Sequence, residues 1–91
     1  MHIIVAYDIP DNRRRNRLAR ALEGFGVRVQ KSIFEADMPD QRIDALYRAI
    51  QAEIDPEEDS IRIWRLCRRC QASVEVIGLG VYIHEAGDEI V

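Results

Sequence analysis

The chain opens with a continuous apolar run, His2-Ile3-Ile4-Val5-Ala6-Tyr7-Asp8, that shows no clean alternation of polar and apolar residues. Such a run is typical of a strand buried on both faces, and it predicts a strand over about Ile3 to Tyr7. Pro10-Asp11-Asn12 follow, and they turn the chain and offer helix-capping groups. The pattern therefore places Asp8 at the exposed end of a central strand.

Two later segments have apolar residues at helical spacing. The first helix is predicted from about Asn12 to Phe25, and Gly24 and Gly26 end it. Its apolar stripe comprises Leu18, Ala21, Leu22 and Phe25. The second helix is predicted from about Gln41 to Ile54, after the break Asp37-Met38-Pro39-Asp40. Its core face comprises Ile43, Leu46, Tyr47, Ile50 and Ile54.

Three other segments favour strands. Val27 to Glu35 alternates, and it predicts either one long strand or two short strands with a tight bend. Ser60 to Leu66 predicts another strand, after the acidic loop Asp55-Pro56-Glu57-Glu58-Asp59. A final β-prone stretch, Ser73 to Ile83, is broken by Gly78 and Gly80, and the rest of the tail is polar.

The resulting order, β-α-β(β)-α-β-β, fits an α+β fold: a ferredoxin-like sandwich whose antiparallel sheet carries both helices on one face. We expect a single domain over residues 1–91, with an extra strand and tail at about 80–91. The other face of such a sheet needs a cover. Two copies packing sheet to sheet, or a last strand added to a partner's edge, would supply it.

Bulk composition excludes several classes of protein. A hydrophobic content of 47% argues against disorder, and a net charge of −3 does not indicate a nucleic-acid binder. The N-terminal run lacks the basic region of a signal peptide, and no apolar stretch approaches a membrane span. We therefore expect a cytoplasmic protein that has no contact with membranes and whose cysteines are reduced.

The positions of the charged residues along the chain are more informative than the net charge. Lys31 is the only lysine, and the arginines cluster at residues 13–20 and 62–69. A positive face on an acidic protein is one interpretation, and the codon bias of a GC-rich genome is the other. On the predicted first helix, Arg13 and Arg20 fall opposite the apolar stripe and Arg17 on its flank. Arg14 and Arg15 point toward the sheet, close to Asp8.

This juxtaposition suits phosphate chemistry, because a carboxylate holds a hard cation and guanidinium groups hold phosphate oxygens. The alternative is that Asp8 caps the next turn and the arginines form a solvated helix face.

Cys67 and Cys70 form an isolated CxxC. A structural zinc ion needs four ligands, and this motif supplies two, so a zinc site would require a dimer that combines two such pairs. A thioredoxin-like redox motif would lie near a βαβ unit, and this one does not. His2 and His84 are isolated, and a structural or exposed role is expected for both. Trp64 has no aromatic neighbours in the sequence, and we expect it to be buried at a dimer surface.

Two segments together carry a resemblance. Tyr7-Asp8-Ile9 with Arg15-Asn16-Arg17, and the run from Gly26 to Glu35, resemble the small CRISPR-associated protein family numbered two, the partner of the CRISPR adaptation integrase. The late Leu66-Cys67-Arg68-Arg69-Cys70 segment, the length and the element order extend the resemblance over almost the whole chain.

The resemblance implies a homodimer in which two copies of Asp8 face each other and hold Mg²⁺, with Mn²⁺ as a substitute. It also implies that Tyr7 belongs to the same site and that Phe34 lies near it. Arg15, Arg17 and Arg28 match basic positions for backbone binding or charge stabilisation. Nucleic-acid phosphates would meet Arg13, Arg14, Arg17, Arg20 and Arg28.

Each of these residues has a structural alternative. Tyr7 and Phe34 also suit core packing, and Arg28 suits a plain sheet edge. Ser32 beside Lys31 has no evident base partner for a role as nucleophile.

These features are consistent with four functions. The first is a metal-dependent endonuclease of RNA or double-stranded DNA acting with the integrase in spacer acquisition. The second is a non-catalytic DNA-binding adaptor that bridges integrase subunits, with the segment beyond Gly80 as a candidate contact. A toxin-like RNA interferase is the third, and the segment from Arg28 to Glu35 argues against it. A regulatory ligand-binding domain is the fourth, and no glycine-rich effector loop supports it.

Overall fold

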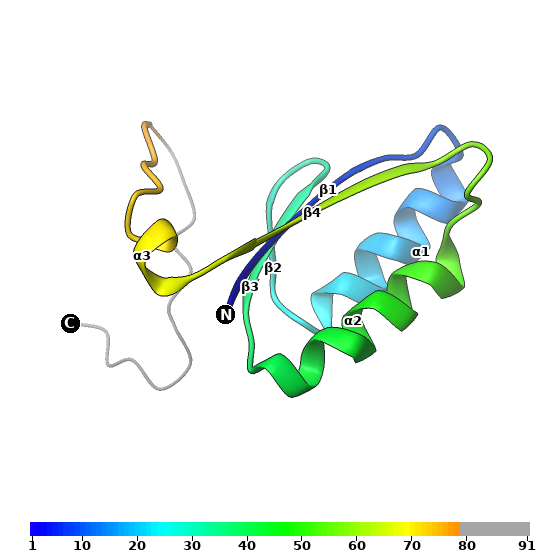
Figure 1. Ribbon diagram of the computed structural model, residues 1–91. Coiled ribbons are helices and arrows are strands. Elements are labelled where there is room, and N and C mark those ends of the chain that lie inside the picture. Colours follow the sequence, from blue (N-terminus) through cyan, green and yellow to red (C-terminus); the bar gives the residue numbers. More distant parts are fainter. Residues whose placement is uncertain (79–91) are drawn as a thin grey trace.

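The computed structural model describes residues 1–78, which form one antiparallel sheet and two long helices (Figure 1). The elements in chain order are β1 (His2–Asp8), α1 (Asn12–Glu23), β2 (Val27–Gln30), β3 (Ile33–Asp37), α2 (Asp40–Glu53), β4 (Ser60–Leu66) and the short α3 (Arg68–Gln71). The four strands lie in the order β2-β3-β1-β4, with every neighbouring pair antiparallel. This arrangement confirms the predicted α+β, ferredoxin-like fold.

Residues 27–37 form two strands rather than one. Lys31 and Ser32 make the bend between β2 and β3, and the pairing is irregular between Arg28 and Gln30. The bend brings Ser32 beside β1, where its carbonyl oxygen accepts a hydrogen bond from the Tyr7 N–H at 3.0 Å. The second of the two predicted alternatives is therefore the correct one.

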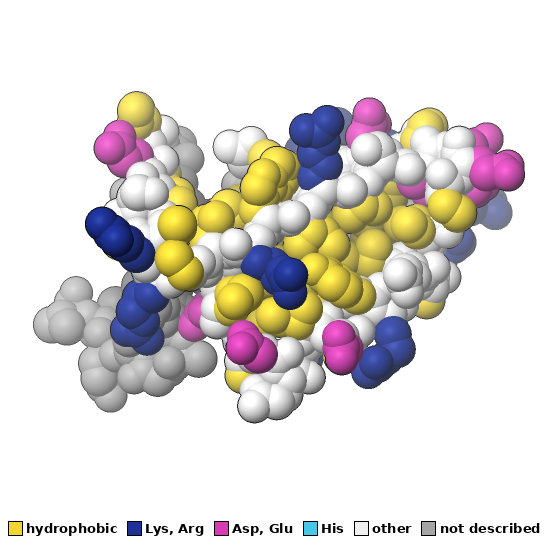
Figure 2. Space-filling view, in the orientation of Figure 1, with side chains coloured by type: hydrophobic (Ala, Val, Ile, Leu, Met, Phe, Trp, Pro, Cys, Tyr) yellow, Lys and Arg dark blue, Asp and Glu magenta, His cyan; other side chains and the backbone are white. Residues whose placement is uncertain are grey.

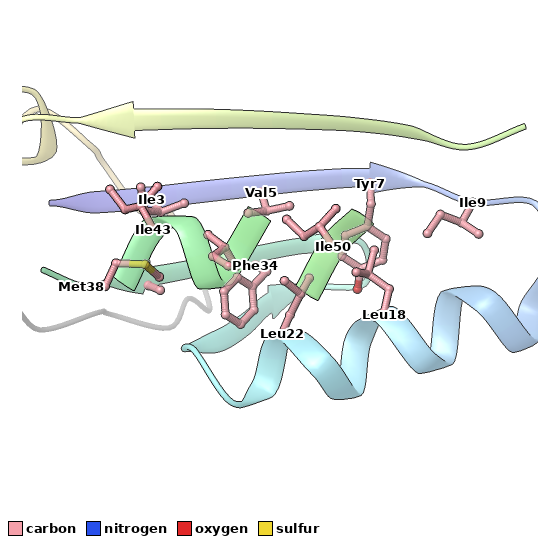
Figure 3. Close-up of a cluster of buried hydrophobic side chains, with 12 residues drawn as sticks. Ile3, Val5, Tyr7, Ile9, Leu18, Leu22, Phe34, Met38, Ile43 and Ile50 are labelled. Atoms are coloured by element: carbon pink, nitrogen blue, oxygen red, sulfur yellow. The ribbon is translucent and has the colours of Figure 1, made fainter. Parts of the chain in front are cut away.

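The core lies between the sheet and the helices. Ile3, Val5 and Tyr7 alternate along β1 and point toward α1 and α2 (Figure 3). Leu18 and Leu22 meet them from α1. Further buried members of this cluster are Phe34 and Ala36 from β3, and Ile43, Leu46 and Ile50 from α2. The buried residues of α1 and α2 occupy apolar positions that the helical spacing predicted. The prediction that β1 is buried on both faces was wrong, because both helices cover the same face of the sheet and burial alternates along the strand.

The opposite face of the sheet carries the alternate positions, and no helix of residues 1–78 packs across it. Ile4, Ala6 and Asp8 lie on this open face in β1. The register of β4 places Trp64, Arg62 and Ser60 directly opposite them. Figure 2 looks onto the edge of β4 and shows hydrophobic side chains between β4 and α2, with charged side chains around them. On the open face, Ile4 and Ala6 are partly buried and Trp64 is 43% exposed. The open face is thus apolar near its centre and polar at the Asp8 end.

Gly26 fixes the distance between the end of α1 and β3. A Cβ atom at this position would lie 2.4 Å from the carbonyl oxygen of Glu35 and 2.6 Å from the Cβ of Ala36. No larger residue fits without movement of β3.

The structure corrects the prediction for the C-terminal part. No strand begins at Ser73: residues 72–78 lie outside any helix or strand, and α3 takes the place of the predicted turn at residues 67–70. The prediction was wrong over residues 73–78 because a strand needs a neighbour for its backbone groups, and none of the described strands lies beside this segment. The remainder of the predicted strand and the tail lie outside the described residues. Within residues 1–78, no helix has the length and apolar content to cross a membrane.

Candidate functional site

Asp8 is exposed at the last position of β1, on the open face of the sheet. Its partner in the β1–β4 register is Ser60, the first residue of β4. Two shallow depressions meet at Asp8. The larger has a volume of about 270 Å³ and is lined by Ala6, Tyr7, Asp8, Ser60 and Arg62. One side of the carboxylate is therefore bordered by a hydroxyl and a guanidinium group from β4.

The second depression lies on the other side of Asp8 and has a volume of about 140 Å³. Arg15 and Lys31 supply its cationic groups, and Tyr7, Asp8, Ile9 and Ser32 complete its lining. Arg15 is fixed in place, because its Nη1 donates to the carbonyl oxygen of Ile9 at 3.0 Å and its Nη2 to Asn12 Oδ1. A carboxylate flanked on both sides by cationic groups is suited to binding a phosphodiester together with a cation.

The start of α1 explains why Arg15 reaches this place. Asp11 caps the helix, and its Oδ2 accepts a hydrogen bond from the Arg14 N–H at 2.8 Å. Only three residues separate the end of β1 from the start of the helix, and the first turn of the helix lies beside Asp8. The sequence predicted Arg15 near Asp8, and the structure places both residues in the lining of one depression.

Arg14, predicted beside Arg15, is turned to other partners. Its Nε and Nη2 donate to the two carboxylate oxygens of Asp59 at 2.9 and 3.0 Å, and Nη2 also donates to Glu58 at 3.1 Å. The hydrogen bond from Arg14 lowers the pKa of Asp59, and the same bond raises the pKa of Arg14. This ion pair ties the start of α1 to the loop before β4, so Arg14 has a structural role here.

Tyr7 and Phe34 are buried, with exposed fractions of 4% and 1%. The Tyr7 hydroxyl donates to the carbonyl oxygen of Lys31 at 3.3 Å, which ties the β2–β3 bend to β1. Phe34 lies within the core between sheet and helices (Figure 3). The structure thus gives Phe34 a packing role and offers no surface on which a base could stack.

The remaining predicted basic residues are spread over the surface. Arg13 and Arg20 on α1 and Arg28 on the edge strand β2 are exposed, and no other described residue pairs with their side chains. Arg17 is also exposed, and its Nε donates to Glu53 of α2 at 3.0 Å. The structure does not bring these four residues together with Asp8 in either depression.

A divalent cation would find one carboxylate here. Residues 1–78 contain no group of three or more His, Cys, Asp or Glu side chains that could hold a metal ion. Mg²⁺ is commonly held by one or two carboxylates and completes its shell with water and phosphate oxygens. An exposed Asp8 on an open face fits one half of such a site.

Sequence reasoning missed Lys31, Ser60 and Arg62 as neighbours of Asp8. The signal for the last two was available, because an antiparallel partner starting at Ser60 begins opposite the end of β1. Lys31 lies at the bend of the β2–β3 hairpin, but its distance from Asp8 depends on the register between β1 and β3, which the sequence does not reveal.

Comparisons with known proteins agree with this architecture. The family model described as "CRISPR associated protein Cas2" matches residues 1–74. A Chloroflexus aurantiacus protein named CRISPR-associated endoribonuclease Cas2 1 is 40% identical over 81 residues, covering 88% of this chain and 87% of its own. A Synechocystis protein named CRISPR-associated endoribonuclease Cas2 3 is 39% identical over 75 residues, covering 82% of both chains.

Among solved structures, a hypothetical protein from Thermus thermophilus superposes with a TM-score of 0.78 at 37% identity, covering 89% of this chain and 94% of its own. The matches in sequence and fold extend over β1, both long helices and β4. By these matches the chain belongs to the Cas2 family of CRISPR-associated proteins.

Proposed function

We propose that this chain is a homodimeric, Mg²⁺-dependent endoribonuclease that acts with the CRISPR integrase in spacer acquisition in the cytoplasm. The observation that carries the proposal is Asp8: an exposed carboxylate on the open face of the sheet, bordered by Arg15 and Lys31 on one side and Arg62 on the other. The relatives that share the fold and about 40% of the sequence are named endoribonucleases.

The open face supports the homodimer. Its centre carries Ile4, Ala6 and the half-exposed Trp64, which lose contact with water if a second copy packs against them. In a twofold pair each residue contacts the equivalent surface of its partner, so the same face that buries Trp64 brings two Asp8 carboxylates toward each other. Two close carboxylates repel unless a cation or a proton lies between them, which favours metal binding.

The chemistry then divides between metal and protein. Bound Mg²⁺ would supply Lewis-acid polarisation of a phosphodiester and of an attacking water. Asp8 would hold the cation, while Arg15, Lys31 and Arg62 would bind non-bridging phosphate oxygens and stabilise the charge that develops on them. Arg15 is already held by Ile9 and Asn12, so little ordering is needed when phosphate arrives.

The deciding experiment is a cleavage assay with purified dimer on single-stranded RNA and on double-stranded DNA, with and without Mg²⁺. Asp8→Asn removes one charge and keeps the shape of the side chain. Asp44→Asn makes the same change at an exposed position of α2 and is the matched control. We expect Mg²⁺-dependent RNA cleavage by wild type and Asp44→Asn, and at least about a hundredfold loss in Asp8→Asn.

Cleavage that survives in Asp8→Asn at the wild-type rate would contradict the proposal, since a co-purified nuclease behaves in that way. Cleavage of DNA but not RNA by wild type would keep the role of Asp8 and change the substrate.

A second candidate is a non-catalytic adaptor that lays its basic surface along DNA and bridges integrase subunits. The specific observation in its favour is that residues 1–78 offer a single carboxylate to the metal, while the exposed Arg13, Arg20 and Arg28 are unpaired among the described residues. Such groups position a duplex without reading its sequence.

Measuring both nucleic-acid binding and RNA cleavage by wild type and Asp8→Asn distinguishes the two candidate functions. A catalytically silent dimer would bind double-stranded DNA equally well in wild type and Asp8→Asn, and neither would cut RNA. An enzyme would lose cleavage in Asp8→Asn while its affinity for substrate fell by a much smaller factor.

A further inference from the structure

Cys67 and Cys70 lie on one turn of chain directly after β4, outside the linings of the two depressions at Asp8. Both are free thiols, and both are exposed. No third His, Cys, Asp or Glu side chain within residues 1–78 joins them in a possible metal site. Two exposed thiols on one turn can react with each other, so the pair can be oxidised to an intramolecular disulfide.

The backbone holds the two cysteines at a fixed spacing. The Gln71 N–H donates to the carbonyl oxygen of Cys67 at 2.9 Å. The carbonyl oxygen of Cys70 accepts from the Ser73 N–H at 3.1 Å and from the Ser73 hydroxyl at 2.7 Å. Cys67 is the N-cap residue of α3 and Cys70 is its third residue, and their side chains interact across this first turn. A disulfide needs Cβ atoms about 3.5–4.5 Å apart. A small tightening of this one turn therefore closes the pair.

The two thiols are not equivalent. The backbone N–H of Cys70 lowers the pKa of Cys67, and the Cys70 thiol contributes further. Its neighbour Cys67 raises the pKa of Cys70. Arg68 and Arg69 occupy the two intervening positions and add positive charge to the turn. Such surroundings favour the thiolate, which is the reactive form of cysteine, at the first position of the pair.

We propose that Cys67 and Cys70 form a redox-active dithiol, which low-molecular-weight disulfides such as oxidised glutathione convert to an intramolecular disulfide. The Cys67 thiolate attacks one sulfur of the oxidant, forms a mixed disulfide and releases one thiolate. Cys70 loses its proton to solvent, attacks Cys67 Sγ and releases the second thiolate. The protein loses two electrons and two protons, and the oxidant is reduced to two thiols.

In a reducing cytoplasm such a disulfide forms transiently, as in redox-sensing proteins. The site is independent of the proposed nuclease activity, so its test needs no substrate.

The experiment treats the reduced full-length protein with oxidised glutathione in the presence of a chelator, quenches it with acid and measures the intact mass. Wild type should lose the mass of two hydrogens and accumulate no adduct. Cys70→Ser should accumulate one glutathione on Cys67, because the resolving thiol is absent. Cys67→Ser should form its adduct on Cys70 several-fold more slowly.

The same two variants in concentrated urea provide the control, since unfolding should bring their adduct rates together. Equal rates for the two variants in the folded protein would overturn the assignment of roles. Two stable adducts on wild type, without an internal disulfide, would overturn the proposal itself. A further arm omits the chelator: wild type that resists oxidation there but is oxidised with the chelator present would replace the proposal with a metal site.

Discussion

The two faces of the sheet come from alternate residues of the same strands, but the helices bury one face and leave the other exposed. On the covered face, Val5 and Phe34 lie opposite each other in the β1–β3 register and are almost entirely buried against the helices. On the open face, Ile4 lies opposite Trp64, and this tryptophan remains 43% exposed. The covered face is completed by the chain's own helices, and it carries the stability of the fold. The open face carries Asp8 and the surface on which the proposed function depends.

The largest effect is expected on the covered face. Phe34→Ala removes a ring that is 1% exposed and leaves a cavity in the centre of the core. We expect the free energy of unfolding to fall by about 3–5 kcal/mol, as measured by urea denaturation. A loss below about 1 kcal/mol would mean that Phe34 is not the packing residue that its burial indicates.

On the open face, Trp64→Asp should leave the fold intact and act on association. It places a charge where a second copy would pack, so we expect the dimer to dissociate at least about ten times more readily in sedimentation experiments. Arg48→Asp, on the exposed side of α2, is the control and should not change association. An unchanged dimer in Trp64→Asp would remove the open face from consideration as the interface.

Arg14 lies on neither face and ties the start of α1 to the loop before β4, and the effect of replacing it should be smaller and dependent on pH. The pKa of Asp59 is lowered in the folded chain, so the pair stabilises the fold above the ordinary aspartate pKa. This contribution disappears as the pH falls through the lowered value. We expect Arg14→Ala to unfold at lower urea than wild type at pH 7, and the difference to shrink below about pH 4. A difference that is the same at pH 7 and pH 3 would contradict this assignment.

The smallest effect is expected from the unpaired arginines. Replacing Arg13 and Arg20 together with Gln should reduce the salt dependence of DNA binding by up to about two units of logarithmic slope, without changing stability. Arg42→Gln is the contrast, because its guanidinium group already donates to the Gly24 carbonyl oxygen and lies 4.5 Å from the centre of the Phe25 ring. An equal change in the salt dependence of DNA binding in Arg42→Gln would contradict the expectation that only arginines without a partner among the described residues contact DNA.

Much of this architecture was predictable because it depends on local periodicity. The strand from Ser60 to Leu66 has the predicted bounds, and the first helix begins at the predicted Asn12. Asp8 and Arg15 were predicted to be neighbours because one short capped turn separates them. What escaped prediction depends on distant pairing. Arg14 meets Asp59 across 45 positions, and nothing local to Arg14 indicates that partner. Likewise, the segment after Ser73 has the composition of a strand, but a strand forms only where another strand lies beside it.

Gly26 has a consequence for how this sequence can vary. Even the smallest side chain would collide there with the backbone of β3, and β3 is hydrogen-bonded to β1, the strand that ends in Asp8. A random-mutagenesis library selected only for accumulation of intact protein should therefore be as depleted of variants at position 26 as at the fully buried Leu46. In such a map, the position with no side chain would be among the least replaceable in the protein.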